Sequence, residues 1–100
     1  MKVIWSPHAV EQAKIITRHI AEDNPVAARH WLNGAFDKTK ALEAFPGIGR
    51  VVAETNDPDT RELIYGNYRI IYRYDKEGVE ILAVRHCKQL LLEEEIKGHA

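Results

Sequence analysis

A single cysteine and the absence of any long apolar run exclude several classes of protein. Cys87 is the only cysteine in 100 residues, so the chain can form no internal disulfide and no cysteine-based zinc site. No apolar run approaches the length of a membrane span, and the opening segment MKVIWSPHAV lacks the apolar core of a signal peptide. We therefore expect a protein without membrane contact in a reducing compartment, the cytoplasm.

The chain also lacks an excess of either positive or negative charge. The chain has 14 Lys and Arg against 15 Asp and Glu, a formal net charge of −1. Proteins that act on nucleic acids usually carry a clear basic excess. Any anion-binding site in this chain must therefore be a local cluster of cations.

Glycine and proline are scarce, and they lie where elements are expected to begin or end. The dipeptides at 6–7 and 24–25, Ser-Pro and Asn-Pro, each combine a capping side chain with a proline at the first helical position. Apolar residues then recur at helical spacing, which predicts helices over 7–22 and 25–44. Because the turn between them is so short, the two helices must lie antiparallel as a helical hairpin.

The segment FPGIGR at 45–50 ends the second helix, and the pattern after it is typical of strands. The closing segment, 88–100, is predicted to form a short helix that docks one apolar edge and leaves its acids in water. Strands are predicted at 2–5, 50–54, 61–65, 68–75 and 79–87. The chain is thus predicted to be one α+β domain over 1–100, with an N-terminal strand, an antiparallel helical hairpin packed on a curved, mainly antiparallel sheet, and a short C-terminal helix.

The turns predict the register of the sheet. If Gly66-Asn67 is a two-residue turn and 75–78 is the next loop, residues opposite each other share a face. One face then holds Leu63, Tyr65, Tyr68, Ile70, Tyr72, Tyr74, Val79, Ile81 and Ala83, and we expect the helices to cover it. The other, open face holds Glu62, Ile64, Arg69, Ile71, Arg73, Glu80, Leu82, Val84 and His86.

Two side chains on the open face form a candidate site. Arg73 falls opposite Glu80, which gives it a structural partner. Arg69 has no acid directly opposite and lies near His86, so this pair could bind an anion. Substitution of such an exposed Arg69 by Ala is expected to leave the fold nearly unchanged.

Five segments in order resemble the RelE/ParE superfamily of toxins from type II toxin–antitoxin modules, also called plasmid-stabilisation proteins. They are WSPHAVEQAKII, NPVAARHW, ALEAFPGIGR, TRELIYGNYRIIYRY and VEILAVRHCK, and together they cover about residues 2–88. The resemblance implies a helical hairpin on a curved antiparallel sheet. It also implies a cognate antitoxin whose C-terminal segment folds onto the toxin, and either a homodimer or a toxin–antitoxin heterotetramer.

The superfamily has two branches with different targets. RelE-like members are ribonucleases that cut mRNA on the ribosome. For that branch the resemblance implies Arg69 as the phosphate-stabilising residue, His86 as the acid and Glu54 as the base, with no metal or cofactor. ParE-like members instead poison DNA gyrase.

The near-neutral charge and the acidic C-terminal segment favour the gyrase branch. In either branch the resemblance suggests Arg50, Arg61 and Arg85 as residues that bind the target or another anion. A third alternative is a non-toxic relative that acts only as a partner-binding module.

Overall fold

Two long helices form one layer of the molecule. The computed structural model describes residues 1–89, 91 and 93–96. Helix α1 (Pro7–Asp23) begins where Ser6 Oγ accepts a hydrogen bond from Ala9 N at 3.1 Å, and α2 (Pro25–Lys40) begins at the equivalent cap on Asn24. Both predicted helix starts are confirmed. The second helix tightens after Lys40 into a 3₁₀ turn, η1 (Ala41–Glu43), so its α-helical part is shorter than predicted.

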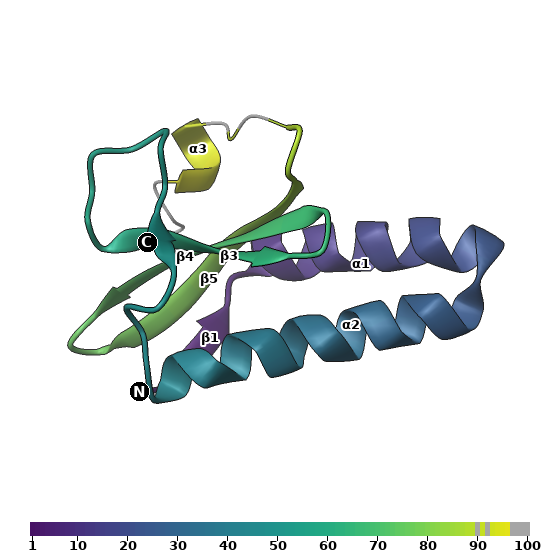
Figure 1. The fold of residues 1–100 in the computed structure, drawn as a ribbon, viewed down its shortest axis with the longest axis horizontal. Helices are drawn as coiled ribbons and strands as arrows, with labels where there is room; N and C mark the ends of the chain where they lie inside the picture. The colour runs from purple at the N-terminus through teal and green to yellow at the C-terminus, as the bar shows by residue number, and fades with distance from the viewer. Residues whose placement is uncertain (90, 92, 97–100) are drawn as a thin grey trace.

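The sheet has five strands in the order β1-β5-β4-β3-β2. Only β1, at the edge, runs parallel to its neighbour, which confirms the predicted α+β fold with a mainly antiparallel sheet. Helix α3 lies on the other side of the sheet from α2 (Figure 1). The bounds are β1 (Val3–Trp5), β2 (Arg50–Val51), β3 (Thr60–Tyr65), β4 (Tyr68–Asp75), β5 (Gly78–His86) and α3 (Glu93–Ile96).

The strand predicted at 50–54 is much shorter in the structure. Strand β2 comprises only Arg50 and Val51, which pair with β3, and the loop 52–59 follows, with Val52 N still donating to the Thr60 carbonyl of β3 at 3.2 Å. In this loop Glu54 lies outside the strands, over the face of the sheet that carries Arg69.

The predicted register is confirmed between β3 and β4, and between β4 and β5 it is confirmed near their connecting turn and wrong beyond it. Across the turn at Gly66, which has a φ of +58°, Tyr65 lies opposite Tyr68 and Ile64 opposite Arg69. Between β4 and β5 the pairing holds as far as Tyr72 and Ile81, and a β-bulge then shifts it by one residue.

Because of the bulge, the side chains at the end of β5 lie on the opposite faces of the sheet from those predicted. Ile71 pairs with Ala83, so Leu82 is the extra residue, and its carbonyl accepts a bond from the buried Ser6 hydroxyl at 3.3 Å. Val84 consequently packs with the helix-side core, and Ala83 packs on the other face, which reverses both predictions.

Apolar clusters lie on both faces of the sheet. The larger one is on the helix side, and the predicted burial of tyrosines there is borne out by Tyr72, which is fully buried. The smaller cluster lies on the face that was predicted to be open. It comprises Val52, Ile71, Ala83 and Leu91, with Ile96 against it.

The C-terminal segment docks an apolar edge, as predicted, through Leu91 and Ile96. Its acids are not all in water, since Glu95 is only 5% exposed. The predictions for Leu90, Leu92 and residues 97–100 lie outside the described residues. No helix in the described part of the chain is long and apolar enough to cross a bilayer.

Candidate functional site

Arginines from β4 and β5 gather on the sheet face away from the helix-side core. Arg69 and Arg73 are four residues apart on β4, and Arg85 of β5 lies directly opposite Arg69. Each of the three meets a carboxylate from a segment outside these two strands. The pairs are Arg69 Nη1 with Glu54 Oε2 at 2.8 Å, Arg73 Nε with Asp57 Oδ2 at 3.5 Å, and Arg85 Nη1 with Glu95 Oε1 at 3.4 Å.

Arg69 is the most deeply buried of these arginines, at 7% exposure. Its two terminal nitrogens donate to the two oxygens of Glu54 at 2.8 and 2.9 Å, in the planar bidentate geometry that suits a guanidinium and a carboxylate. Its Nε donates to Glu62 at 2.5 Å. Every nitrogen of the Arg69 guanidinium is therefore bonded to a carboxylate.

Glu62 links this pair to a fourth charge. Its other oxygen accepts from Arg50 Nε at 2.7 Å, and its side chain is only 4% exposed. The chain of contacts runs from Arg50 through Glu62 and Arg69 to Glu54, with two positive and two negative charges. We call these four residues the Arg69 network.

Glu54 and Arg69 favour each other's charged state. Hydrogen bonds from Arg69 lower the pKa of Glu54 to about 2; burial opposes this lowering, and the charge of Arg69 adds a smaller contribution to it. Hydrogen bonds to Glu54, and then to Glu62, raise the pKa of Arg69 above its usual value against the effect of burial. A carboxylate with a pKa near 2 is a weak base for a ribose hydroxyl.

His86 does not join Arg69, contrary to the prediction. The bulge puts His86 opposite Tyr68, on the helix side of the sheet, where the two rings make an edge contact at 5.5 Å. Its Nδ1 accepts from Lys88 N at 3.1 Å, which places the proton of the neutral ring on Nε2. The sheet therefore separates His86 from the other two residues of the nuclease set.

The remaining predicted arginines lie in three separate places. Arg50 belongs to the Arg69 network but is 68% exposed. Arg61 lies at the rim of the helix side, where it donates to the carbonyls of Pro58, Gly47 and Gly49 and stacks 5.9 Å from the Tyr74 ring. Arg85 lies beside Glu95 on the arginine-bearing face.

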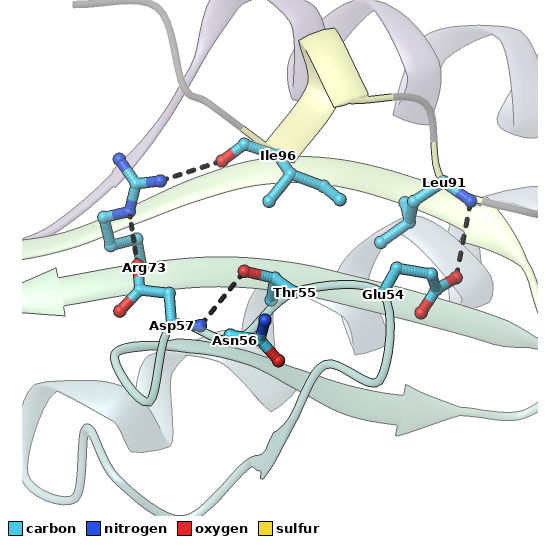
Figure 2. A pocket seen from close by; sticks show the side chains of 7 residues that line it. All are labelled: Glu54, Thr55, Asn56, Asp57, Arg73, Leu91 and Ile96. Atoms are coloured by element: carbon cyan, nitrogen blue, oxygen red, sulfur yellow. Dashed lines mark hydrogen bonds and ion pairs between the residues drawn. The ribbon is translucent and has the colours of Figure 1, made fainter.

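Two shallow pockets flank the Arg69 network. The first, of about 470 Å³, lies between the loop 52–59 and the C-terminal segment. Figure 2 shows Arg73 on one side of it, bonded to Asp57 and to the Ile96 carbonyl, and Glu54 on the other side, near Leu91 N. The second, of about 620 Å³, is lined by Arg50, Val51, Ala53, Glu54, Glu62, Arg69, Cys87, Lys88 and Gln89. Glu54 lines both pockets and stands between them.

Cys87 is exposed, and no group of three or more His, Cys, Asp or Glu among the described residues is arranged to hold a metal ion. The chemistry available on this face is therefore that of arginines, a lysine and carboxylates, which bind and orient charged groups.

Three acidic residues that neutralise the arginines of this face are not predicted from the sequence as their partners. The predicted register places Glu62 on the correct face, but it offers Arg69 only the residue directly opposite as a partner. Glu62 pairs with Ile71, two positions along, and such diagonal neighbours lie within reach of long side chains. Asp57 and Glu95 come from a loop and from the C-terminal segment, for which strand periodicity gives no position.

Comparisons with known proteins bear on the fold and the family. A family model described as the ParE toxin of the type II toxin–antitoxin system parDE matches residues 3–91. Among solved structures, the chromosomal ParDE TA system from P. aeruginosa is similar over 86% of this chain and 95% of that chain, with a TM-score of 0.71 and 18% sequence identity. No curated protein matches the chain. At this identity the likeness to the solved structure is evidence of a shared fold.

Proposed function

Because the chain belongs to the ParE toxin family of type II toxin–antitoxin systems, we propose that it inhibits growth by poisoning DNA gyrase and that a cognate antitoxin neutralises it. The observation that supports a protein target most directly is the Arg69 network. The arginine that a ribonuclease would aim at a phosphate is instead bonded at every guanidinium nitrogen to Glu54 or Glu62.

The other two residues of the ribonuclease alternative also argue against that alternative. Glu54, the supposed base, has a pKa lowered to about 2 by Arg69. His86, the supposed acid, lies on the opposite face of the sheet. A phosphodiester bound against one face could not be reached by all three side chains.

The antitoxin part of the proposal is supported by exposed apolar side chains at the end of the helical hairpin. Phe45 is 64% exposed, Ile48 is 55% exposed and Val51 is 43% exposed, all within seven residues of sequence. An antitoxin segment that folds as a helix or strand could cover such a surface. A toxin–antitoxin heterotetramer or a toxin homodimer is the assembly that we expect.

The test is to express the chain from a tightly repressed promoter without its antitoxin. We expect growth arrest with filamentation, gyrase covalently linked to broken DNA, and intact mRNA. Purified toxin added to gyrase, ATP and supercoiled plasmid should give linear DNA after protease and detergent treatment.

A His86→Ala variant serves as the matched control, because the ribonuclease alternative needs that imidazole as its acid. Ribosome-dependent mRNA cleavage that disappears in this variant, with DNA intact, would contradict the proposal. Normal growth at high expression would also contradict it and would favour a module that only binds a partner.

A further inference from the structure

The two carboxylates on Arg69 differ in how they are held. Glu62 lies within strand β3, and its side chain is 4% exposed. Glu54 lies in the loop 52–59, and its side chain is 25% exposed. Since it comes from a loop and borders solvent, Glu54 can leave Arg69 without disturbing the sheet, whereas Glu62 cannot.

The Glu54 carboxylate lines a groove in which cations outnumber carboxylates. The groove is the 620 Å³ pocket, which contains Arg50 and Lys88 as well as Arg69. With Glu54 in place, three cations face two carboxylates. If Glu54 swings out, the same three cations face Glu62 alone, and the outward nitrogens of Arg69 become a bidentate site for another carboxylate.

An exposed apolar side chain lies on the same face of the sheet as this groove. Ile64, which is opposite Arg69 across the hairpin, is 40% exposed. Apolar contacts beside a cationic subsite suit a peptide that carries acidic and apolar side chains together.

We propose that this groove binds a carboxylate side chain of an acidic peptide segment from a partner protein, and that this carboxylate replaces Glu54 on Arg69. Glu54 thus acts as an internal ligand that fills the subsite when the partner is absent. The inference goes beyond the proposed function, because it holds whether the partner is the target or another protein.

A peptide fits this groove better than a nucleic acid. A peptide brings one carboxylate to one guanidinium, in the geometry that Glu54 already shows. A polynucleotide would bring a row of phosphates along a face where Asp57, Glu62 and Glu95 add negative charge.

Competition from Glu54 also sets how tightly a partner must bind. An attached carboxylate competes at an effective concentration in the millimolar range or above, so a free carboxylate in solution displaces it poorly. A partner therefore needs further contacts, such as one with Ile64. Removal of Glu54 should open the subsite to simple carboxylates.

The first experiment measures thermal unfolding of Glu54→Ala with sodium acetate as the probe. We expect the substitution to lower Tm by about 5 °C. Acetate should restore at least half of that loss in a saturable way, and sodium chloride at equal ionic strength should not. The matched control is Glu22→Ala, which removes an equally charged but 73% exposed carboxylate and should show no response to acetate.

The second experiment measures binding of a fluorescein-labelled hexaglutamate peptide by anisotropy. Glu54→Ala should bind it about tenfold more tightly than the unsubstituted chain does, because the internal competitor is gone. Addition of Lys88→Ala to Glu54→Ala should reverse most of this gain without unfolding, because Lys88 lies at an exposed turn.

A folded Glu54→Ala variant that responds neither to acetate nor to the peptide would overturn the proposal and make Glu54 a purely structural partner. A labelled single-stranded RNA that gains affinity on this substitution while the peptide does not would also overturn it.

Discussion

Arg69 carries its charge where water hardly reaches it. Burying an unpaired charge costs several kcal/mol, and a pair recovers that cost only when the hydrogen-bonding geometry is good. Arg69 meets this condition, because its terminal nitrogens bind both oxygens of Glu54 and its Nε binds Glu62. Arg69 therefore contributes to the stability of the fold as well as to the positive charge of the groove.

This burial predicts that Arg69→Ala destabilises the protein, the reverse of the expectation from sequence. The variant leaves Glu62 buried without its closest cation, so we expect unfolding free energy to fall by about 3–5 kcal/mol. Arg18→Ala is the control, since Arg18 is 69% exposed in a long 3.5 Å pair and should cost less than about 1 kcal/mol. Urea unfolding followed by circular dichroism measures both, and equal small losses would contradict the assigned role.

Glu54 predicts a specific dependence of stability on pH. Its pKa falls from 4.5 to about 2 on folding, so its contribution is fully present above about pH 4.5 and is lost as pH falls toward 2. Between pH 6 and pH 3, Glu54→Gln should therefore lose about 1 kcal/mol less stability than the unsubstituted chain. Unfolding free energies at the two pH values provide the comparison, and parallel losses would show that Glu54 is not paired in solution.

At the scale of elements, the loop between α2 and β2 is fixed by one buried tyrosine. Tyr72 on β4 donates to the Pro46 carbonyl at 2.6 Å and accepts from Gly49 N at 2.9 Å. A Cβ on Gly49 would lie 2.6 Å from both the Tyr72 hydroxyl and the Glu62 carbonyl oxygen. Glycine is therefore required here by close approach, and the contact sets the position from which Arg50 reaches Glu62.

Gly49→Ala should consequently destabilise the protein by about 2 kcal/mol, because neither obstacle can move without disturbing the sheet. Gly47→Ala, in the same turn, is the control. Its Cβ would lie 3.2 Å from the Tyr74 hydroxyl, and we expect a loss below about 1 kcal/mol. Thermal denaturation of the two variants distinguishes them, and a tolerated Gly49→Ala would mean that Tyr72 does not hold this loop.

On the scale of the whole molecule, the sheet separates two environments. The helices bury one face in the larger apolar core, while the loop 52–59 and the C-terminal segment cover the other with both apolar and acidic groups. Arg69, Arg73 and Arg85 on that second face each meet a carboxylate from the same chain. The face is basic in sequence but close to neutral once the chain is folded.

This neutralisation predicts weak binding to nucleic acids. With a net charge of −1 and its arginines paired internally, the chain should bind a single-stranded RNA more weakly than about 100 µM at physiological salt. Fluorescence anisotropy over a series of salt concentrations measures this. Tight binding that falls steeply with salt would show that the carboxylates give way to phosphates.

The local parts of the fold could be predicted because their causes lie within a few residues of sequence. Ser6 and Asn24 cap the helices that follow them, and the turn at Gly66 fixes the register of β3 against β4. The bulge at Leu82 could not be predicted from the alternation of side chains. Apolar residues occupy consecutive positions in this part of β5, so a shift by one residue still buries apolar side chains on both faces.

The order of the elements, the capped helical hairpin and the sheet face of Arg69 all follow from the sequence, because hydrogen bonds between near neighbours and side-chain alternation set them. The role of Arg69 on that face depends instead on long-range contacts. Its partners Glu54 and Glu62 and its distance from His86 depend on a loop that folds back and a bulge that reverses a face. Both are long-range packing outcomes, since the free energy of burying a charged pair depends on where the rest of the chain lies.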